Sequence, residues 1–448
     1  MFLHLLYFTV LAFGFLAPIG AAGGEISFRR EIAPLLQAKC LACHNAEKAK
    51  GGYRLHTFDS LLHAGKSKKP PLVPGKPEQS ELFLRIIAAD PDDRMPQKDE
   101  PLGQTQIDLI QRWIREGANL DFPNRQALLA SLVPKGPHPL PPSKYPRPVP
   151  IIALAFTPDG EKLAASGHHE VTFWNSKGEC TGRLTNVPQR VRSLAFDPAA
   201  KFLAVAGGQS GRSGELGVYN LQSGSLETNL LQTADELLCV TFSADGSKLA
   251  AGGTDNSIHL FNWPAGEKIT SIQQHADWVA ALCFNSDGTR IASASRDRTA
   301  RVYDSQTGAL DATYTGQNAA LFAVAFLSGG EIASGGRDKV LHLWSVSDGK
   351  KKREITGLGG DVYALARSSH SLFSASADGK VRQHSLSDSK LVRQYDGHTD
   401  AVYSLTICEP ARKVAAGSYN GLVKVWNIDD GSLETTFVAT PGFGNSRD

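Results

Sequence analysis

Apolar residues in the last two thirds of the chain form short runs separated by polar turns. Most runs end in an aromatic residue and a turn, a stretch of small residues follows, and a third stretch ends in a large side chain. Asp-Gly pairs such as Asp245-Gly246 supply the positive φ that tight hairpins need. The large side chains that end the third stretches are Trp174, Tyr219, Phe261, Tyr303, Trp344, His384 and Trp426.

A repeat of about 40 to 45 residues with four short strands is typical of β-propellers. One four-stranded sheet cannot bury both of its faces, whereas a closed ring lets each sheet cover its neighbours. The seven large side chains therefore predict an all-β seven-bladed propeller over residues 151–438, with a tail at 439–448.

The last complete repeat carries further polar residues at fixed offsets. They are Gly397, His398, Asp400, Ser418 and Asn420, with Trp426 closing the set. With these residues the pattern resembles the WD-repeat family over residues 151 to about 438. His275, Asp297 and Tyr303 match that family more loosely, and His384 departs from it by standing at a Trp position. The resemblance implies a module that binds or docks another protein.

Residues 23–120 show helical spacing instead and predict a small all-α domain. Phe28, Ile32 and Leu35 recur along one face and lead into Cys40. Ser80 is placed to cap a second helix, whose apolar positions are Leu82, Phe83, Ile86 and Ile87.

A third helix has the clearest pattern in this part of the chain. Thr105 and Asp108 form a capping-box pattern at its start, and Gly117 is a natural stop. Its apolar stripe consists of Ile107, Ile110, Trp113 and Ile114.

Two further segments separate or precede these domains. Residues 1–22 are almost wholly apolar and end in small residues, which predicts a signal peptide; an uncleaved N-terminal anchor is the alternative. We therefore expect a periplasmic or otherwise exported protein. Residues 121–150 hold nine of the 24 prolines and predict a semi-rigid, Pro-rich linker.

The sequence Cys40-Leu-Ala-Cys43-His44 is the strongest chemical signal in the chain. Two thiols at this spacing can each bind one edge of a porphyrin covalently, and the next imidazole is then placed as an axial ligand of the iron. The alternatives are a redox dithiol, which needs a thioredoxin-like context, and a zinc site, which needs further ligands. We expect one covalent haem c on Cys40 and Cys43, with His44 on the iron.

Met95 is the candidate for the second axial ligand. It is the only methionine besides Met1. Its neighbours in sequence are charged residues and Pro96, which is unusual for a residue of an apolar core. A thioether ligand raises the reduction potential and closes the iron to exchange. The alternatives are a gap-filling role for Met95, or ligation by His56 or His63 instead.

Residues 28–120 resemble the planctomycete-type cytochrome c domain. Besides the Cys40–His44 motif, the matching segments are Ile32–Leu35, Gly51–Leu55, Val73–Pro77 with Ser80, Met95-Pro96 and Trp113–Ala118. The resemblance implies that Cys40 and Cys43 attach haem c, that His44 is the proximal ligand and that Met95 is the distal ligand. It also implies haem attachment outside the cytoplasmic membrane, in agreement with the signal segment.

The net charge and the positions of four arginines limit the kinds of partner that we expect. A net charge of +2 gives no reason to expect binding to nucleic acid or to an anionic membrane, beyond an N-terminal anchor. Arg296, Arg298 and Arg337 lie in turns after second strands, and Arg382 lies in the strand that follows such a turn. Together they would favour an acidic partner or form a solvated rim.

Three functions are compatible with these features. The first is electron transfer to an unknown redox partner protein, with the propeller as a docking module. The second is a haem enzyme, either peroxidase-like or a propeller oxidoreductase, and the third is a haem-based redox sensor or scaffold. Ligation by Met95 would leave no open iron position, which favours an electron carrier over an enzyme.

Overall fold

In the computed structural model, the N-terminal part forms only short helices, because glycine and proline interrupt its apolar stretches. The structure describes residues 26–46, 48–97, 100–122, 125, 126, 129 and 138–443. The helices are α1 (Ala33–Lys39), α2 (Phe58–Leu61), α3 (Glu81–Ile86) and α4 (Gln104–Arg115). A π-helical turn at Phe28–Ile32 precedes α1, and 3₁₀ turns occur at Lys50–Gly52, Pro77–Gln79 and Ser328–Gly330.

Two of the expected helix starts differ from the capping patterns. The α4 helix begins at Gln104, and Gln106 rather than Asp108 accepts a hydrogen bond from the flanking backbone, at Gly103 N. Ser80 precedes α3 without capping it, because its hydroxyl binds the backbone of Val73 and Lys76 instead. The expected stop at Gly117 is confirmed, since α4 ends at Arg115 and Gly117 has a φ of 109°.

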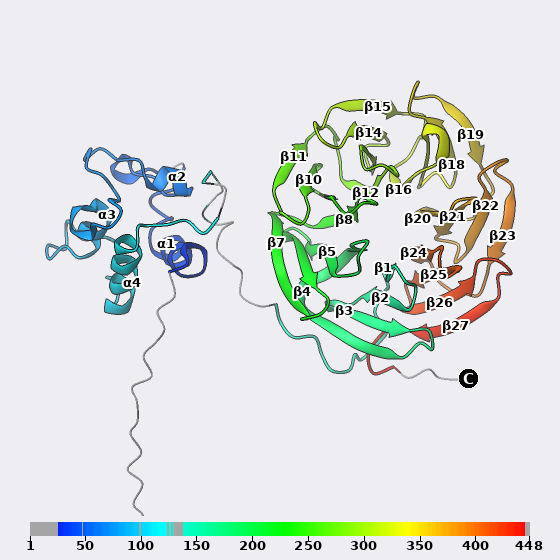
Figure 1. Ribbon diagram of the computed structural model, residues 1–448, viewed down its shortest axis with the longest axis horizontal. Coiled ribbons are helices and arrows are strands. Elements are labelled where there is room, and N and C mark those ends of the chain that lie inside the picture. Colours follow the sequence, from blue (N-terminus) through cyan, green and yellow to red (C-terminus); the bar gives the residue numbers. More distant parts are fainter. Residues whose placement is uncertain are drawn as a thin grey trace, which may run out of the picture. The chain divides into compact units, whose positions relative to one another are not determined.

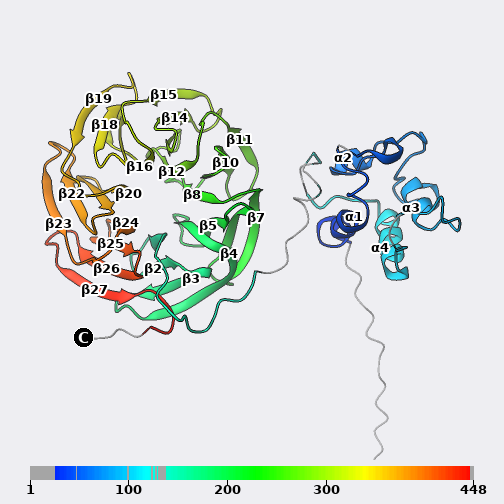
Figure 2. The same cartoon turned by 180° about the vertical axis from the view of Figure 1, so that it is seen from behind.

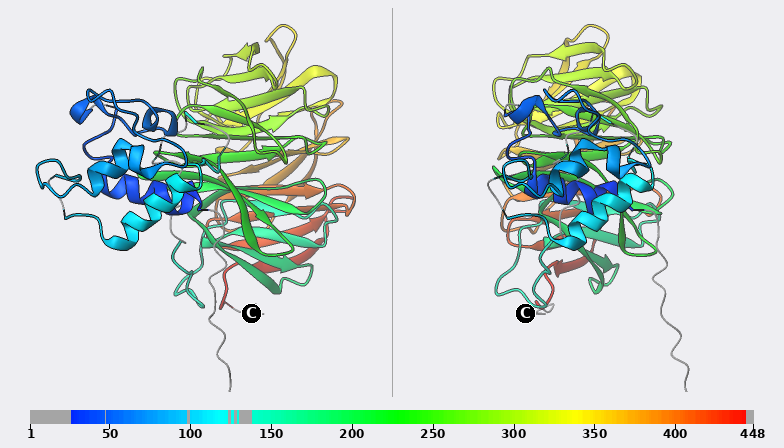
Figure 3. Two further views of the ribbon diagram at one scale, coloured as in Figure 1. Left: turned by 60° about the vertical axis from the view of Figure 1, so that its left-hand side comes forward. Right: turned by 90° about the vertical axis from the view of Figure 1, so that its left-hand side faces the viewer.

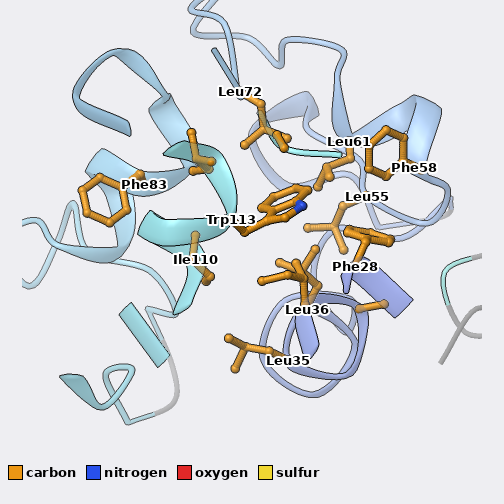
Figure 4. Packing of buried hydrophobic residues seen from close by; sticks show 14 of the residues in the cluster. Phe28, Leu35, Leu36, Leu55, Phe58, Leu61, Leu72, Phe83, Ile110 and Trp113 are labelled. Atoms are coloured by element: carbon orange, nitrogen blue, oxygen red, sulfur yellow. The ribbon is translucent and has the colours of Figure 1, made fainter. Parts of the chain in front are cut away.

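The chain divides into two units, residues 1–136 and 137–448, which we call the helical unit and the β unit. The helical unit has one apolar core, with Trp113 in the middle of the cluster (Figure 4). Phe28 packs on Trp113 and on Phe58, at ring-centroid distances of 5.4 Å and 4.9 Å. The Trp113 indole N–H donates to the Asn119 carbonyl at 2.9 Å, so its polar atom is satisfied within this core.

The β unit consists of six antiparallel sheets built from strands that are neighbours in sequence (Figure 1). The first sheet contains β1 (Leu154–Phe156), β2 (Lys162–Ser166), β3 (His168–Asn175), β4 (Cys180–Phe196), β5 (Phe202–Gln209), β6 (Ser213–Asn220) and β7 (Ser225–Thr233). The second contains β8 (Leu237–Phe242), β9 (Lys248–Gly253), β10 (Ile258–Asn262) and β11 (Lys268–Ile272). The third contains β12 (Val279–Phe284), β13 (Arg290–Ser295), β14 (Ala300–Asp304) and β15 (Leu310–Tyr314).

The remaining three sheets repeat this four-stranded order. They contain β16 (Leu321–Phe326), β17 (Glu331–Gly336), β18 (Leu341–Ser345) and β19 (Lys351–Ile355); then β20 (Val362–Arg367), β21 (Ser371–Ser376), β22 (Val381–Ser385) and β23 (Leu391–Tyr395); then β24 (Val402–Cys408), β25 (Lys413–Ser418), β26 (Leu422–Asn427) and β27 (Leu433–Val438). Seen from behind and from the side, these sheets are twisted and follow one another around a ring (Figures 2 and 3).

The first sheet is larger than the others because β4 takes part in two pairings. Its first part, Cys180–Arg190, pairs with β3, and its second part, Arg190–Phe196, pairs with β5. The sequence repeat predicts seven separate sheets, whereas the hydrogen bonds join the first two repeats into one sheet of seven strands.

The inner strands contact one another in cyclic order. β4 contacts β1 and β8, the contacts continue through β12, β16 and β20 to β24, and β24 contacts β1. At this last junction the Ser404 hydroxyl donates to the Ile151 carbonyl at 2.9 Å. The two ends of the β unit therefore meet and are joined by a buried hydrogen bond.

Buried polar side chains link neighbouring strands in several repeats. His275 binds Asp297 at 2.8 Å and Ser293 at 2.7 Å, which is a fuller network than its loose sequence match predicted. In the last repeat, His398 binds Ser418 at 3.0 Å, and its ring lies 5.8 Å from Trp426.

The predicted signal segment, residues 1–22, lies outside the described residues. Within the parts that are described, the longest helix, α4, has 12 residues, and none is long and apolar enough to cross a membrane.

Candidate functional site

Cys40, Cys43 and His44 form a turn that continues directly from α1. The Cys40 N–H donates to the Leu36 carbonyl at 2.9 Å, as in the helix itself. The N–H groups of Cys43 and His44 then both donate to the Cys40 carbonyl, at 3.2 Å and 3.1 Å. The sequence motif is therefore a local, hydrogen-bonded structure, and its three functional side chains project from one turn.

The His44 imidazole is oriented by a backbone carbonyl. Its Nδ1 lies 3.2 Å from the carbonyl oxygen of Tyr53, so Nδ1 carries the proton and donates. Nε2 is then unprotonated and has no partner among the described residues. This is the second-shell arrangement that presents a histidine as a metal ligand, because the bond at one nitrogen fixes the tautomer and ring orientation for the other.

Tyr53 is itself held in place on both sides. Its hydroxyl donates to the Leu61 carbonyl at 2.9 Å, and its ring packs edge-on against His44 at 5.6 Å. The neighbouring Leu55 N–H donates to the His44 carbonyl at 2.8 Å. This role of Tyr53 is not visible in the sequence, because every residue has a backbone carbonyl whatever its type. Its position within the quoted segment Gly51–Leu55 was the only available signal.

Both thiols of the turn are free and half-buried. Cys40 packs against the core of the helical unit. Burial, and then the nearby Cys43, raise the pKa of the Cys40 thiol to about 12, so it is protonated at neutral pH. A zinc site needs further ligands, and no group of three metal-binding side chains occurs in the described part of the chain.

Met95 lies on a separate segment that is anchored to α3. Its N–H donates to the Arg85 carbonyl at 2.9 Å, and Arg85 in turn binds Asp93 at 2.7 Å. Met95 is half-buried, and it is not among the apolar residues that form the core of the helical unit or pack against it. The structure therefore gives no support to a gap-filling role for Met95.

The two histidines considered as alternative ligands both make contacts with α2. The His63 ring is exposed, and its Nδ1 binds the Asp59 carbonyl at 2.8 Å. His56 Nδ1 lies 3.4 Å from the Ser60 hydroxyl.

The surface of α3 carries apolar side chains without cover in this unit. Leu84 and Ile87 are 42% and 44% exposed, and they lie on the segment that also anchors Met95. A porphyrin is a large apolar ring, so exposed apolar surface beside a candidate ligand fits its binding. Two thiols, an imidazole nitrogen and a thioether are the kinds of donor that hold haem c.

Comparisons with known proteins match both parts of the chain. Residues 40–99 match the family described as Planctomycete cytochrome C. Residues 225–262, 266–304, 308–345 and 389–427 match the family described as WD domain, G-beta repeat.

Two curated relatives come from Dictyostelium discoideum. The anaphase-promoting complex subunit cdc20 is 30% identical over 108 residues, which is 24% of this chain and 22% of that protein. Protein tipD is 26% identical over 126 residues, which is 28% of this chain and 20% of that protein. The matches thus span about a fifth of the length of these relatives. The two family matches support a fusion of a planctomycete-type cytochrome c domain with WD repeats.

Proposed function

We propose that this protein is an exported electron carrier with one covalently attached haem c. Cys40 and Cys43 would form the two thioether bonds, and His44 and Met95 would be the axial ligands of the iron. Haem c, when bound, would supply reversible one-electron chemistry at its iron. The protein's contribution is to fix both ligands and to limit access of water to them.

The orientation of His44 is the observation that carries this proposal. A histidine whose Nδ1 donates to the Tyr53 carbonyl presents a basic, unpartnered Nε2 beside two free thiols. A redox dithiol would need no such histidine. An electron carrier is favoured over a peroxidase in this proposal because ligation by Met95 would leave no open iron position for peroxide.

In this proposal the β unit, which we call the WD-repeat unit from here on, is a closed seven-bladed propeller that docks a partner protein. Support for seven blades comes from the cyclic contacts of the inner strands and from the double pairing of β4, which counts as the outer strand of one blade and the inner strand of the next. Support for docking comes from the match to WD repeats, a family of interaction modules. The proposed partner is a redox protein.

The proposal that the protein is exported rests on the chemistry of haem attachment and not on the described structure. The resemblance to cytochrome c domains implies that haem is attached outside the cytoplasmic membrane, and residues 1–22 have the composition of a signal peptide. A periplasmic or otherwise exported location is therefore part of the proposal.

Spectra of the full chain, produced in a host that matures c-type cytochromes, test the haem assignment. We expect a pyridine haemochrome typical of two thioether bonds, one haem per chain, and a low-spin six-coordinate spectrum. Met95→Ala should become high-spin in at least one oxidation state and bind added carbon monoxide or cyanide faster. His63→Ala is the matched control, and its spectrum should stay low-spin.

Each contrary result has a definite meaning. A colourless protein with both thiols open to alkylation would refute the haem assignment. A five-coordinate wild type that turns over peroxide would favour the enzyme. A Met95→Ala variant with an unchanged low-spin spectrum would assign the second ligand to another residue.

A further inference from the structure

The ring of the WD-repeat unit carries one β-bulge at the same place in six successive inner strands. The pairing slips at the second residue of β8, β12, β16, β20 and β24. In β4 it slips at the third residue of the part that pairs with β5, so that one residue in each strand stands out of the ladder. The residues at these bulges are Arg192, Leu238, Ala280, Phe322, Tyr363 and Tyr403. A bulge redirects the side chain of its extra residue, and three of these side chains, Leu238, Ala280 and Phe322, line one cavity.

Large side chains at these bulges meet across neighbouring sheets. The rings of Phe322 and Tyr363 lie 5.8 Å apart, those of Tyr363 and Tyr403 lie 4.8 Å apart, and Tyr403 contacts Tyr419 at 6.0 Å. Tyr419 is 54% exposed, so this aromatic arc reaches the surface. The arc covers about half of the ring.

The arc ends in a cavity at Ala280. There the bulge carries only a methyl group, whereas the flanking bulges carry Leu238 and Phe322. A cavity of about 460 Å³ opens at this point, and Trp278, Arg296, Ala320 and Arg337 complete its lining. Its floor is apolar, and the two arginines stand at its mouth.

The two arginines differ in how far they are neutralised. The Arg296 guanidinium lies over the Trp278 ring at 4.1 Å and 3.6 Å from the Asp277 carboxylate. Arg337 is exposed, and among the described residues its guanidinium has no hydrogen-bond or ion-pair partner. One cation beside the cavity therefore has no counter-charge, and an anionic ligand would supply it.

We propose that the Ala280 cavity docks an acidic peptide segment of a partner protein, with an apolar side chain in the cavity and carboxylates on Arg296 and Arg337. This inference rests on the proposed docking role of the WD-repeat unit and specifies its partner. A chain-like ligand is favoured over a small anion because the cavity continues into the exposed aromatic arc. A peptide is favoured over nucleic acid because the net charge of the chain is only +2, which gives no broad basic surface for a phosphate backbone.

Selection of peptides against the full haem-loaded chain tests this proposal. The probe is a phage-displayed library of random octapeptides, and the selected peptides are then synthesised with fluorescein and measured by anisotropy. We expect enrichment of aspartate and glutamate around at least one leucine, isoleucine or phenylalanine. Replacing the acidic residues of a selected peptide by their amides should weaken its binding at least tenfold.

Three variants locate the site. Ala280→Phe fills the cavity and should weaken binding at least tenfold; it should fold, because Phe322 occupies the equivalent bulge one sheet further on. Arg337→Glu should also weaken binding at least tenfold. Arg298→Glu changes the net charge equally at an exposed residue that does not line the cavity, and it should change binding less than twofold. Circular dichroism and the haem spectrum check that each variant is folded.

The contrary outcomes separate this inference from the proposed function. Peptides that bind Ala280→Phe and Arg337→Glu as tightly as the wild type would overturn the inference and leave a docking role at another surface. Failure to select any peptide would count against both, whereas the haem spectra would still report on electron transfer. Displacement of the peptide by millimolar succinate, or tighter binding of a single-stranded DNA oligonucleotide, would overturn the assignment to an acidic peptide.

Discussion

The two units of this protein reach stability in different ways. The helical unit has one core around Trp113, formed by helices of 4 to 12 residues and long connecting turns. The WD-repeat unit has several smaller cores, each shared between neighbouring sheets; one of them joins Phe373 of β21 to Val414 and Trp426 of the next sheet. Repetition gives the second unit many equivalent contacts, whereas the first depends on a single set.

This difference bears on the proposed haem site. The Cys40–His44 turn and the Met95 segment are irregular parts of the helical unit, and exposed apolar residues stand beside Met95. A unit that leaves Leu84 and Ile87 uncovered gains stability when a large apolar ligand binds. We therefore expect the helical unit, but not the WD-repeat unit, to depend on haem for part of its stability.

Removal of both thiols should give the largest effect and tests this contrast directly. Cys40→Ser with Cys43→Ser should lose covalent haem completely and lower the melting temperature of the helical unit, because no thioether can form. The transition of the WD-repeat unit should not move. Differential scanning calorimetry and haem absorbance of the same samples measure both. The contrast would fail if the two transitions fell together.

Paired tryptophan truncations compare the two kinds of core. Trp113→Ala should destabilise the helical unit by about 3–5 kcal/mol, since a buried indole and its hydrogen bond to Asn119 are lost. Trp344→Ala in β18 removes an indole that stacks on Tyr314 at 5.2 Å and should cost the WD-repeat unit a similar amount. Urea unfolding, followed separately by haem absorbance and far-ultraviolet circular dichroism, assigns each loss to its unit. A loss that appeared in both units would show that they unfold together.

The histidine that stands in a tryptophan position should make the WD-repeat unit sensitive to acid. Burial, and then Arg382, lower the pKa of His384 from 6.5 to about 4, so the folded state holds it neutral while the unfolded state binds a proton below pH 6.5. Stability is therefore fully present above pH 6.5 and is lost as the pH falls toward 4. We expect His384 to account for up to about 3 kcal/mol of this loss.

His384→Phe is the variant that isolates this effect. It keeps an aromatic ring in register with Leu372 but cannot be protonated, so the melting temperature should fall less between pH 6.5 and 4 than in the wild type. Part of the acid sensitivity should remain, because burial and Lys424 also lower the pKa of His398 to about 4. An identical pH profile for variant and wild type would exclude His384 as a source.

The smallest effect concerns a helix cap in the helical unit. The Thr57 hydroxyl accepts a hydrogen bond from the Ser60 N–H at 3.0 Å, and the Ser60 hydroxyl accepts one from the Thr57 N–H at 2.9 Å. Thr57→Ala should cost about 1 kcal/mol, visible as a lower urea midpoint for the helical unit alone. Thr57→Ser retains the hydroxyl and should stay near the wild type; an equal loss in both variants would point to packing instead of capping.

The sequence predicted the local features of both units better than the contacts between distant residues. The spacing of Cys40, Cys43 and His44 was sufficient to foresee a single turn, and the apolar stripe of α4 was sufficient to foresee its buried face, because both depend on neighbours within one or two turns. The Tyr53 carbonyl that orients His44 could not be foreseen, since every residue has a carbonyl. The cavity at Ala280 was equally hidden, because it depends on the larger side chains at the bulges of two other sheets. Ligation by Met95 remains a prediction.

Of the four arginines expected on one rim from their sequence positions, two line the same cavity and two do not. Arg298 is exposed and lies outside the lining of that cavity. Arg296 and Arg337 line the same cavity. Arg382 is buried instead and binds Asp378 at 2.6 Å, because the turn that precedes its strand brings this carboxylate alongside. Position along a strand predicted the edge of the sheet but not the direction of the side chain.

The double pairing of β4 has a consequence for the tolerance of this protein to insertions. Elsewhere in the ring a loop connects each outer strand to the next inner strand, and such loops accept extra residues at little cost. Between the first two repeats the strand runs through without a break, so a tag or epitope placed near Arg190 would disrupt two ladders at once. Amide protons along this strand should also exchange together with the two repeats that it joins, as one cooperative block.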